Sequence, residues 1–335
     1  MTHPVLVEVT RGGIAESVHR GSVAIIDADG HTVLALGDID KPVFPRSAIK
    51  GLQAIPLIES GAADTYALSD QEIALACASH NGELEHVATA AGMLSKVGLD
   101  VSALECGTQF PMRANAGHPL IRAGASPTAL HNNCSGKHAG FLCVACTEGV
   151  DHRGYVEAGH PVMREVTAAI AEMSGHALDH AVCGTDGCSI PTHAIPLRAM
   201  ALAFARFGTG HGLGPERAKA VQRIRQAVAR APFFVAGTER FDTIAMTILK
   251  ERAFVKVGAE GVYCAALPEL GFGVALKCDD GTTRAAEVMM AAVITRYLTL
   301  SETDKTALQP LANPRLMNWN GIHVGDIRAV GGLTG

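Results

Sequence analysis

A serine and a lysine stand three residues apart in the segment Ser47-Ala-Ile-Lys50. On a helix, this spacing places both side chains on one face, with their Cβ atoms about 5 to 6 Å apart. A serine becomes a nucleophile when a base removes its proton, and a lysine is such a base when burial or nearby positive charge lowers its pKa. So short a spacing also recurs by chance, and a helix-start serine followed by a solvated lysine is the plain alternative.

A second group of reactive side chains lies in the polar run His131-Asn-Asn-Cys-Ser-Gly-Lys-His138 and in the loop Cys183-Gly-Thr-Asp-Gly-Cys188. Cys134, His138 and the cysteines of this loop offer the soft donor atoms that zinc takes. Their spacing is not that of a zinc finger, and buried free thiols without a metal are the alternative. These residues indicate a site and leave its metal open.

Two further segments carry polar groups within apolar surroundings. Ser79-His-Asn-Gly-Glu83 ends an apolar run and opens a helix, so we expect a cap or a turn facing a pocket. Lys256 lies in a strand pattern with apolar neighbours, where an ammonium is costly unless it is paired or deprotonated. The alternative is that Lys256 lies on the solvent side of that strand. The glycine-rich segments match neither a dinucleotide loop nor a phosphate loop, so nucleotide binding is not expected.

The elements that must position these residues fall into three parts. Strand patterns cover residues 5–36, with turn residues between the strands at 22–26 and 32–36. A helical pattern of apolar residues begins at Ser47, and apolar residues recur at spacings of three and four at 84–97, 163–173, 197–207, 217–230 and 243–249, which predicts helices. Strand patterns return at 253–277, followed by a helix at 284–300.

Strands at both ends around a helical middle predict an α+β fold, with one antiparallel sheet that the chain leaves and rejoins. We expect a single domain over residues 1–335, β-rich at 1–45 and 250–300 and helical at 46–249. Residues 301–335 are polar and glycine-rich, so we expect an extended tail on the surface or on a second subunit.

The composition excludes several classes of function. Hydrophobic residues make up 48% and charged residues 18% of the 335 residues, which indicates a large core and excludes disorder. A net charge of −5 provides no basic field, so no nucleic-acid partner is expected. No leader pattern is visible at the start, and no apolar stretch reaches the ~18 residues of a membrane span. We therefore expect a soluble cytoplasmic protein with no membrane partner and with reduced thiols.

Five segments, taken in order, resemble the Rhizobium etli type (class 3) L-asparaginases. They are Phe44-Pro-Arg-Ser-Ala-Ile-Lys50, Ala78-Ser-His-Asn-Gly-Glu83, His131-Asn-Asn-Cys-Ser-Gly-Lys-His138, Asp186-Gly-Cys188 and Lys256-Val-Gly-Ala-Glu-Gly261. The match runs over nearly the whole chain. The resemblance implies a homodimeric amidohydrolase with a serine β-lactamase-like (glutaminase-like) fold, which hydrolyses L-asparagine to L-aspartate and ammonia.

The resemblance also implies roles for individual residues. Two Ser–Lys pairs are Ser47 with Lys50 and Ser79 with Lys256. They lie beside a Zn²⁺ ion whose ligands are Cys134, Lys137 and Cys188, with a water as the fourth. A lysine can ligate only when neutral, so metal binding must displace its proton. The implied substrate-binding residues are Arg46, Asn133, His138 and Asp186. Where some relatives carry a further site cysteine, this chain has Asp242.

The mechanism that we expect is acyl transfer. Neutral Lys50 takes the Ser47 proton, the alkoxide attacks the side-chain amide carbon, ammonia leaves, and water releases aspartate from the ester. One alternative is another serine amidohydrolase or acylase, of the glutaminase or penicillin-binding type. Another is a non-catalytic zinc-binding or ligand-binding protein on the same fold. Release of ammonia from asparagine separates these functions.

Overall fold

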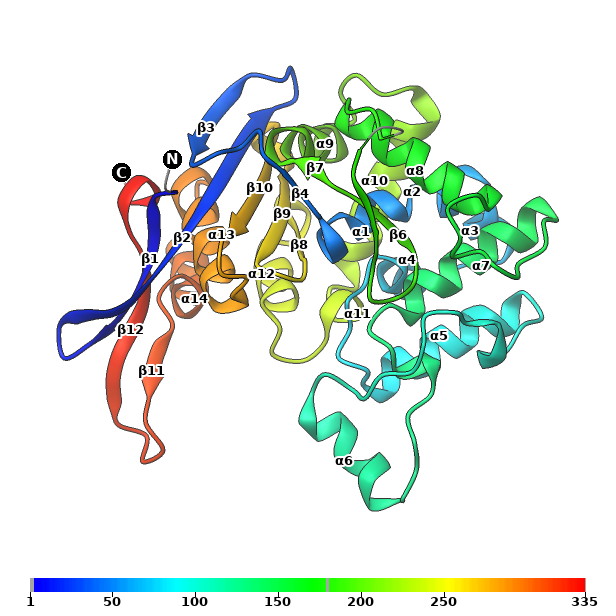
Figure 1. Ribbon diagram of the computed structural model, residues 1–335, viewed down its shortest axis with the longest axis horizontal. Helices are drawn as coiled ribbons and strands as arrows, with labels where there is room; N and C mark the ends of the chain where they lie inside the picture. Colours follow the sequence, from blue (N-terminus) through cyan, green and yellow to red (C-terminus); the bar gives the residue numbers. More distant parts are fainter. Residues whose placement is uncertain (1–2, 179–180, 335) are drawn as a thin grey trace.

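The structure is a computed structural model that describes residues 3–178 and 181–334. An antiparallel sheet lies towards one end of the molecule and most of the helices lie towards the other (Figure 1). Its strands follow the order β11-β12-β1-β2-β10-β9-β8, and β3 pairs with β2 off this path. The strands are β1 (Val5–Arg11), β2 (Ile14–Asp27), β3 (Thr32–Leu36), β8 (Phe254–Val257), β9 (Val262–Leu267), β10 (Phe272–Cys278), β11 (Arg315–Met317) and β12 (His323–Ala329).

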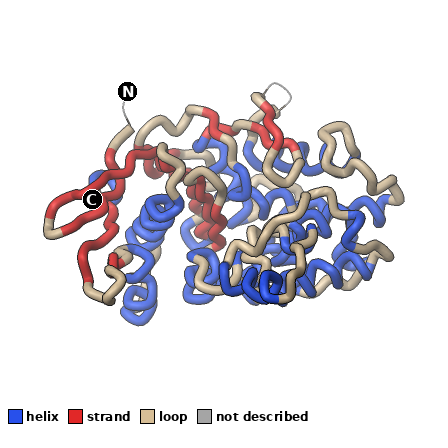
Figure 2. The backbone as a smooth tube through the Cα atoms, turned by 60° about the horizontal axis from the view of Figure 1, so that its bottom comes forward, coloured by secondary structure: helices blue, strands red, loops and turns tan. Residues whose placement is uncertain are grey.

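The helical part follows β3 along the chain; most of its helices lie beyond the sheet, whereas α9 (Leu197–Thr209) packs on it (Figure 2). The helical part also contains two small two-stranded sheets. One pairs β4 (Pro42–Val43) with β7 (Ile195–Pro196), and the other pairs β5 (Cys183–Thr185) with β6 (Pro191–His193). The helices of this part are η1 (Arg46–Ile49), α1 (Lys50–Gln53), α2 (Ile55–Glu59), α3 (Ala62–Thr65), α4 (Asp70–Ala76), α5 (Leu84–Lys96), η2 (Val101–Ala103), α6 (Ala114–Arg122), η3 (Ala129–His131), α7 (Ser135–Glu148), α8 (Pro161–Ser174), α9 (Leu197–Thr209), α10 (Pro215–Arg230), α11 (Phe233–Ala236), α12 (Phe241–Leu249) and η4 (Lys250–Arg252). Towards the end of the chain lie η5 (Pro268–Leu270), α13 (Thr283–Tyr297), α14 (Glu302–Ala312) and η6 (Gly331–Leu333).

Helix α7 is the centre of the helical part. Its residues 135–145 are all buried, which is typical of a helix that other helices enclose. Helices α4, α5 and α8 pack against it. The first turn of α7 carries the polar residues that the sequence singled out, so the packing of α7 places them deep inside the protein.

Strand β2 is long enough to pair with two neighbours. Its first half, residues 14–20, pairs with β1, and its second half, residues 21–27, pairs with β10. Residues 21–26 are all buried, whereas residues 14–18 are exposed. Continuous burial of the second half is typical of a strand that is covered on both faces.

Helices α9 and α13 cover opposite faces of the sheet. A Cβ atom at Gly273 in β10 would come within 1.9 Å of Ala201 O in α9. Gly21, which pairs with Cys278 of β10, lies close to Met289 of α13. Successive side chains on a strand point to opposite faces, and positions 273 and 278 differ by an odd number of residues. Position 273 therefore faces α9, whereas position 278 and its partner Gly21 face α13. Only a glycine at position 273 lets α9 approach the sheet this closely.

The predicted α+β architecture is confirmed. Strands lie at both ends of the chain, the middle is helical, and the N-terminal hairpin turns between β2 and β3 as predicted. The helices and strands predicted between residues 84 and 300 coincide with α5, α8, α9, α10, α12, β8, β9, β10 and α13 to within a few residues. Within residues 3–178 and 181–334, no helix combines the length and the apolar character that crossing a membrane requires.

The helix expected from Ser47 onward is divided into short pieces. The segment begins as the 3-10 turn η1, continues as the single turn α1, and is separated at Ala54 from α2. Pro56 in the first turn of α2 lacks an N–H and its ring crowds the carbonyl four residues earlier, which favours a break in the helix at this point.

The expectation of an extended tail over residues 301–335 is wrong for most of that segment. It forms α14, β11 and β12, and β12 pairs antiparallel with β1. Three apolar side chains anchor this segment, since Leu308, Ile327 and Leu333 are all buried. An unpaired strand edge favours the addition of another strand, and β12 covers the edge that β1 would otherwise expose.

Candidate active site

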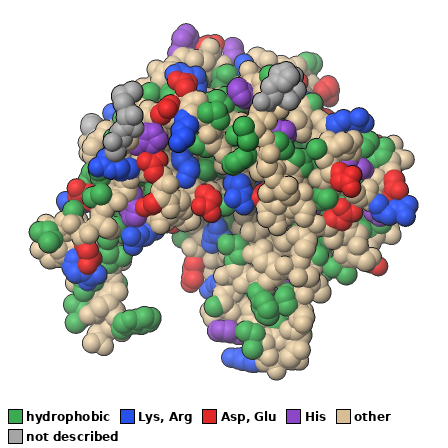
Figure 3. Space-filling view, in the orientation of Figure 1, with side chains coloured by type: hydrophobic (Ala, Val, Ile, Leu, Met, Phe, Trp, Pro, Cys, Tyr) green, Lys and Arg blue, Asp and Glu red, His purple; other side chains and the backbone are tan. Residues whose placement is uncertain are grey.

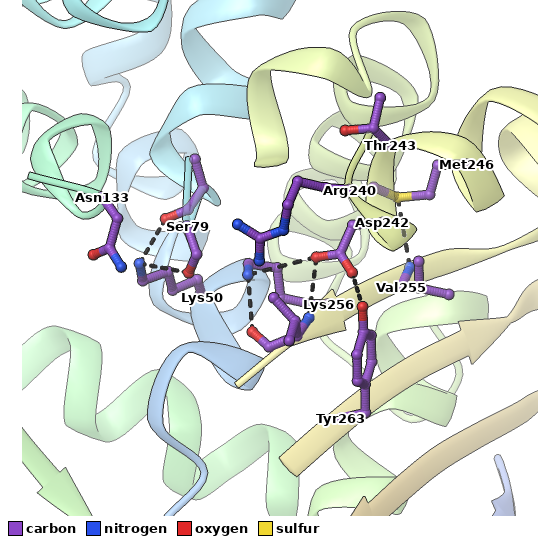
Figure 4. A network of polar contacts seen from close by, with 12 residues as sticks. Lys50, Ser79, Asn133, Arg240, Asp242, Thr243, Met246, Val255, Lys256 and Tyr263 are labelled. Atoms are coloured by element: carbon purple, nitrogen blue, oxygen red, sulfur yellow. Dashed lines mark hydrogen bonds and ion pairs between the residues drawn. The ribbon is translucent and has the colours of Figure 1, made fainter. Parts of the chain in front are cut away.

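Lys50 joins three segments that are far apart in the sequence. Its side chain is fully buried, and its Nζ donates to Ala78 O at 2.6 Å, Ser79 Oγ at 3.0 Å and Cys134 Sγ at 3.0 Å. Figure 4 shows Lys50 beside Ser79, and a separate set of contacts that joins Lys256, Asp242 and Tyr263. All three N–H bonds of an ammonium have partners here. Lys50 must therefore lose a proton before its nitrogen can accept one.

Ser47 lies one 3-10 turn before Lys50. The backbone N–H of Lys50 donates to Ser47 O, and side chains three residues apart in a 3-10 helix are eclipsed. The two side chains therefore share a face, as the sequence predicted. Among the described residues, however, the amine of Lys50 donates to Ser79 and makes no hydrogen bond with the Ser47 hydroxyl. Ser47 is half-buried, whereas Ser79 is only 4% exposed.

Ser79 is held in place by its backbone. Helix α4 ends at Ala76, and the following chain runs between α11 and the start of α7. The N–H groups of Ser79, His80 and Asn81 donate to the carbonyls of Val235, Asn133 and Ala236, respectively, at 2.9 to 3.1 Å. These bonds fix the hydroxyl of Ser79 against Lys50.

Lys256 lies in β8 with its whole side chain buried. Its Nζ donates to Val257 O at 2.9 Å and lies 3.7 Å from Asp242 Oδ2. No hydrogen bond between Lys256 and Ser79 is present in the described residues, so the predicted second Ser–Lys pair is not in direct contact. Burial lowers the pKa of Lys256 to about 7, with Lys50 adding to this effect and Asp242 opposing it.

Cys134, Lys137 and Cys188 come together as predicted, and all three are buried. Cys134 caps the start of α7, Lys137 lies in its first turn, and Cys188 follows β5. Lys137 Nζ donates to Cys188 Sγ at 3.0 Å, and the two thiols are hydrogen-bonded to each other. Two sulfurs and one nitrogen thus converge at one point.

The charges of Cys134, Lys137 and Cys188 determine which of these three residues are protonated. The hydrogen bond with Cys188 lowers the pKa of Cys134 well below its usual value, and Lys50 and Lys137 contribute in the same direction against the effect of burial. The same hydrogen bond and burial raise the pKa of Cys188. Burial works against the charge of Lys137, yet Cys188 and Cys134 raise its pKa. The thiol pair therefore shares one negative charge, which Lys137 balances.

This donor set fits zinc. Thiolate sulfur is a preferred zinc ligand, and a neutral amine adds a nitrogen. Binding a metal would replace one proton of Cys188 and one of Lys137. His138 supports the assignment of this region as a binding site, because its buried Nε2 has no partner among the described residues.

The implied substrate-binding residues surround the same point. Arg46 Nε donates to Asp186 Oδ1 at 2.6 Å, and Asp186 Oδ2 lies 3.9 Å from Cys188 Sγ. Burial opposes ionisation of Asp186, but Lys137 and Arg46 outweigh it and hold the pKa of this carboxyl below its usual value. Arg46 itself has a positive φ of 51°, a costly conformation for a residue with a side chain.

His138 and Asn133 complete the set. His138 Nδ1 lies 2.8 Å from Tyr155 Oη, and burial lowers the pKa of His138 well below its usual value, so its ring is neutral. Asn133 Oδ1 lies 3.0 Å from Cys134 Sγ. Tyr155 was not predicted, because nothing in the sequence around it distinguishes a tyrosine that orients a histidine from an ordinary core tyrosine.

Arg240 and Tyr263 are further residues that the sequence analysis did not select. Arg240 Nη1 donates to Asn81 Oδ1 at 3.1 Å. Tyr263 donates to Asp242 Oδ1 (Figure 4). A signal for Arg240 existed in the sequence, since it stands two residues before Asp242. Tyr263 lies in an apolar strand, where no pattern indicates a polar role.

A second group of possible metal donors lies near the end of β10. Ligand atoms of His19, Cys278 and Asp280 lie within 4.8 Å of one another. Asp280 accepts from Cys278 Sγ and Thr282 N, and its other oxygen lies 2.6 Å from His19 Nδ1. These hydrogen bonds already use the donor atoms, so this group is explained without a metal.

Comparison with known proteins identifies the family. A family model described as L-asparaginase II matches residues 7–329. No curated protein matches the chain in sequence. Solved structures similar to this chain include a β-lactamase from Mycobacterium bovis, with 12% identity, a TM-score of 0.44 and coverage of 83% of this chain and 94% of that chain.

Two further solved structures are similar at the same level. D-alanine carboxypeptidase AmpC from Burkholderia cenocepacia is 14% identical, with a TM-score of 0.42 and coverage of 83% of this chain and 93% of that chain. A mutant simvastatin synthase from Aspergillus terreus is 10% identical, with a TM-score of 0.41 and coverage of 77% and 86%, respectively. The match to the family model spans nearly the whole chain and includes every residue of the site described above, and the chain belongs to the L-asparaginase II family of amidohydrolases.

Proposed function

We propose that the protein hydrolyses L-asparagine to L-aspartate and ammonia by acyl transfer to a serine. The observation that carries this proposal is the position of Lys50, a buried amine that contacts Ser79 and shares a helical face with Ser47. Membership of the L-asparaginase II family supports the substrate. The arrangement supplies a hydroxyl nucleophile and a base in one water-poor site.

We assign the nucleophile to Ser47 because a nucleophile must reach the substrate. Ser47 is half-buried, while Ser79 is almost fully enclosed and already bonded to Lys50. In the first step the Ser47 O–H bond breaks, its proton moves to neutral Lys50, and Ser47 Oγ bonds to the amide carbon. The C–N bond then breaks, and the amide nitrogen leaves as ammonia with a proton returned by the lysine. Water attacks the ester, and the released serine regains its proton.

Ser79 and Lys256 extend the proton path in this scheme. The Lys50 amine donates to Ser79 Oγ, so a proton gained from Ser47 can be passed on by the hydroxyl of Ser79. Lys256, with a pKa of about 7, is neutral in a useful fraction near neutral pH. Because Lys256 makes no hydrogen bond with Ser79 within the described part of the chain, it can accept that proton only after its side chain moves or through a bridging water. The residues thus form the proposed relay Ser47, Lys50, Ser79 and Lys256.

The zwitterionic head group of an amino acid suits the pair of Arg46 and Asp186. A substrate carboxylate would take one side of the Arg46 guanidinium, and an ammonium would face the Asp186 carboxylate. His138 and Asn133 would contact the remaining polar atoms of the substrate. The neutral ring of His138 has a free buried Nε2 for this purpose.

We also propose that Cys134, Lys137 and Cys188 hold one zinc ion, with a water as fourth ligand. When bound, the ion supplies a fixed positive charge that favours neutral lysines and a developing oxyanion. For the cell, we propose a cytoplasmic homodimer. All nine cysteines lie in the described residues as free thiols, which agrees with a reducing compartment.

Ammonia release from asparagine, glutamine and a chromogenic β-lactam at equal concentrations tests the function. We expect turnover of asparagine and little of glutamine, because one added methylene moves the amide away from a fixed nucleophile. Comparable turnover of both amides would refute this selectivity. Turnover of the β-lactam alone would instead favour an acylase of the penicillin-binding type.

Mass spectrometry of acid-quenched enzyme with asparagine then identifies the nucleophile. The aspartyl ester should lie on the peptide that contains Ser47, and Ser47→Ala and Lys50→Ala should each reduce kcat by about 10³-fold or more. An ester on the Ser79 peptide would exchange the roles of the two serines. Near-full activity of Ser47→Ala without any ester would contradict acyl transfer.

A further inference from the structure

Asp242 is a buried carboxylate that is held from two strands. It lies in the first turn of α12 and is 1% exposed. Its Oδ2 accepts from Val257 N of β8 at 3.1 Å, and its Oδ1 accepts from the hydroxyl of Tyr263 in β9. Burial raises the pKa of Tyr263 well above its usual value, so the phenol keeps the proton that it donates. These two bonds fix the carboxylate in one orientation.

Lys256 is the cation that faces this carboxylate most closely. Its Nζ lies 3.7 Å from Asp242 Oδ2, and the exposed fractions of the two side chains are 0% and 1%. The same amine donates to Val257 O, and Asp242 accepts from Val257 N. The backbone of Val257 in β8 therefore contacts both groups: its N–H donates to Asp242, and its carbonyl accepts from Lys256.

The other charged groups around Lys256 come from several elements. Lys50 in α1 and Arg240, just before α12, repel its ammonium, while Cys134 at the start of α7 attracts it. Cys77 after α4 and Cys264 in β9 also face Lys256, and burial raises the pKa of both thiols, that of Cys77 to about 12, so both are neutral. Glu287 in α13 faces Asp242 and Arg240, and burial raises its pKa to about 7.

We propose that Asp242 is a positioning residue for the reaction, whose carboxylate holds the Lys256 amine in place and stabilises the ammonium that forms when Lys256 accepts a proton from Ser79. The proposal rests on the proposed Ser–Lys relay. In the step concerned, the Ser79 O–H bond breaks and an N–H bond forms on Lys256, while Ser79 takes a proton from Lys50. The positive charge then lies 3.7 Å from Asp242 Oδ2 instead of beside the Ser47 nucleophile.

The sign of the effect follows from the charges. Burial lowers the proton affinity of Lys256 and Asp242 raises it. Removing the charge of Asp242 therefore leaves Lys256 neutral down to a lower pH and makes it a weaker base. In a variant without this charge, the part of the pH profile where kcat rises should move to lower pH. The maximal kcat reached above it should be smaller. A carboxylate that only supported the fold would change stability and would leave the position of this part of the profile unchanged.

The experiment measures Lys256 directly as well as through activity. Zinc-loaded enzyme is produced with lysine labelled with ¹³C at Cε, and the Lys256 signal is assigned by its loss in Lys256→Met. We expect Asp242→Asn to lower the titration midpoint of Lys256 by at least about one pH unit, a tenfold loss of proton affinity. The acid limb of kcat for asparagine should move in the same direction by the same amount.

Three further variants control the experiment. Tyr263→Phe removes one hydrogen bond from Asp242 and keeps its charge, so the Lys256 midpoint should stay near that of the unmodified enzyme while kcat falls. If Asp242→Asn does not fold by circular dichroism, Asp242→Cys removes the same charge with a residue that tolerates burial. Asp242→Glu keeps the charge and should restore the midpoint.

An unchanged Lys256 midpoint in a folded neutral variant would overturn the pairing. A shifted midpoint with an unshifted kcat profile would overturn its role in the reaction. Failure of the proposed function is a separate result, namely no ammonia from asparagine with the unmodified enzyme, because the titration of Lys256 does not depend on turnover.

Discussion

Three buried lysines meet around the site, and each has a different kind of partner. Lys50 donates to a carbonyl, a hydroxyl and a sulfur, Lys137 to a thiol, and Lys256 lies beside a carboxylate. A buried ammonium without such partners is costly. Burial, with Lys50 adding to its effect, lowers the pKa of Lys256, whereas Cys188 and Cys134 raise the pKa of Lys137 against the effect of burial. Of the three amines, Lys256 is thus the one whose lowered pKa suits a base near neutral pH.

At the residue scale, we predict one zinc ion per chain. Cys134→Ser and Cys188→Ser should each lose most of the metal, because a serine hydroxyl is a poor replacement for a thiolate. Elemental analysis of folded variants measures this, with Cys146→Ser as the control, since Cys146 is a half-buried cysteine near the other end of α7. Metal content should also fall at acid pH as Lys137 and the thiolates regain protons.

Wild-type zinc content in both site variants would contradict this assignment. Equal loss of metal in the Cys146→Ser control would contradict it as well, because it would trace the loss to general destabilisation.

The sequence predicted which residue types gather in the site but not how they pair. Cys134, Lys137 and Cys188 converge as predicted, and the sulfur and nitrogen chemistry of these residues was visible in the sequence. The partner of Lys50 was not, because a long lysine side chain selects its acceptor by tertiary position. Lys50 contacts Ser79, which is 29 residues away, while Ser47 is three residues away. The catalytic roles of these residues stay predictions.

At the element scale, the end of β8 packs directly against η1. A Cβ atom at Gly258 would come within 2.8 Å of Pro45 O and 3.1 Å of Ala48 N. Both contacts are with backbone that cannot rotate away, and they flank Ser47. The close approach of β8 therefore helps to set the position of the Ser47 hydroxyl.

We predict that Gly258→Ala reduces kcat/KM by about 10²-fold, because a displacement of about 1 Å at a nucleophile costs this much. The melting temperature should fall as well, since the added methyl group overpacks a close contact. Gly92→Ala is the matched control, because Gly92 lies in α5 with nothing within 4 Å of its Cβ position. That variant should keep full activity and gain about 0.5–1 kcal/mol of stability. Full activity of Gly258→Ala would show that η1 accommodates the methyl group.

The elements differ in how well the sequence predicted them. Helices with a regular apolar face, such as α5 and α10, were predicted because periodicity alone defines them. The break after α1 depends on Pro56, and the strands β11 and β12 depend on the free edge of β1. Pairing between residues that lie some 320 positions apart, such as Val7 with Ala329, leaves little local signal.

At the scale of the whole molecule, two hairpins extend from the sheet and carry exposed apolar side chains. One is formed by β1 and β2 and the other by β11 and β12 (Figure 1). Ile14 is 72% exposed in the first hairpin, and Trp319 and Ile322 are 106% and 58% exposed between β11 and β12. Figure 3 shows hydrophobic side chains at the ends of both projections and a deep notch beside them. Apolar groups gathered in this way are typical of a surface that contacts another protein.

We predict that the occupant of this surface is a second copy of the same chain, as the resemblance to homodimeric asparaginases implies. Light scattering coupled to size-exclusion chromatography should give twice the chain mass of 34.9 kDa. Trp319→Ser combined with Ile322→Ser should shift the protein towards the monomer, because burial of these two side chains would provide much of the association energy. Leu84→Ser, at an 81% exposed apolar residue of α5, is the control and should stay dimeric. A monomeric unmodified protein would refute the dimer, and a dimer that survives the double substitution would place the interface on another surface.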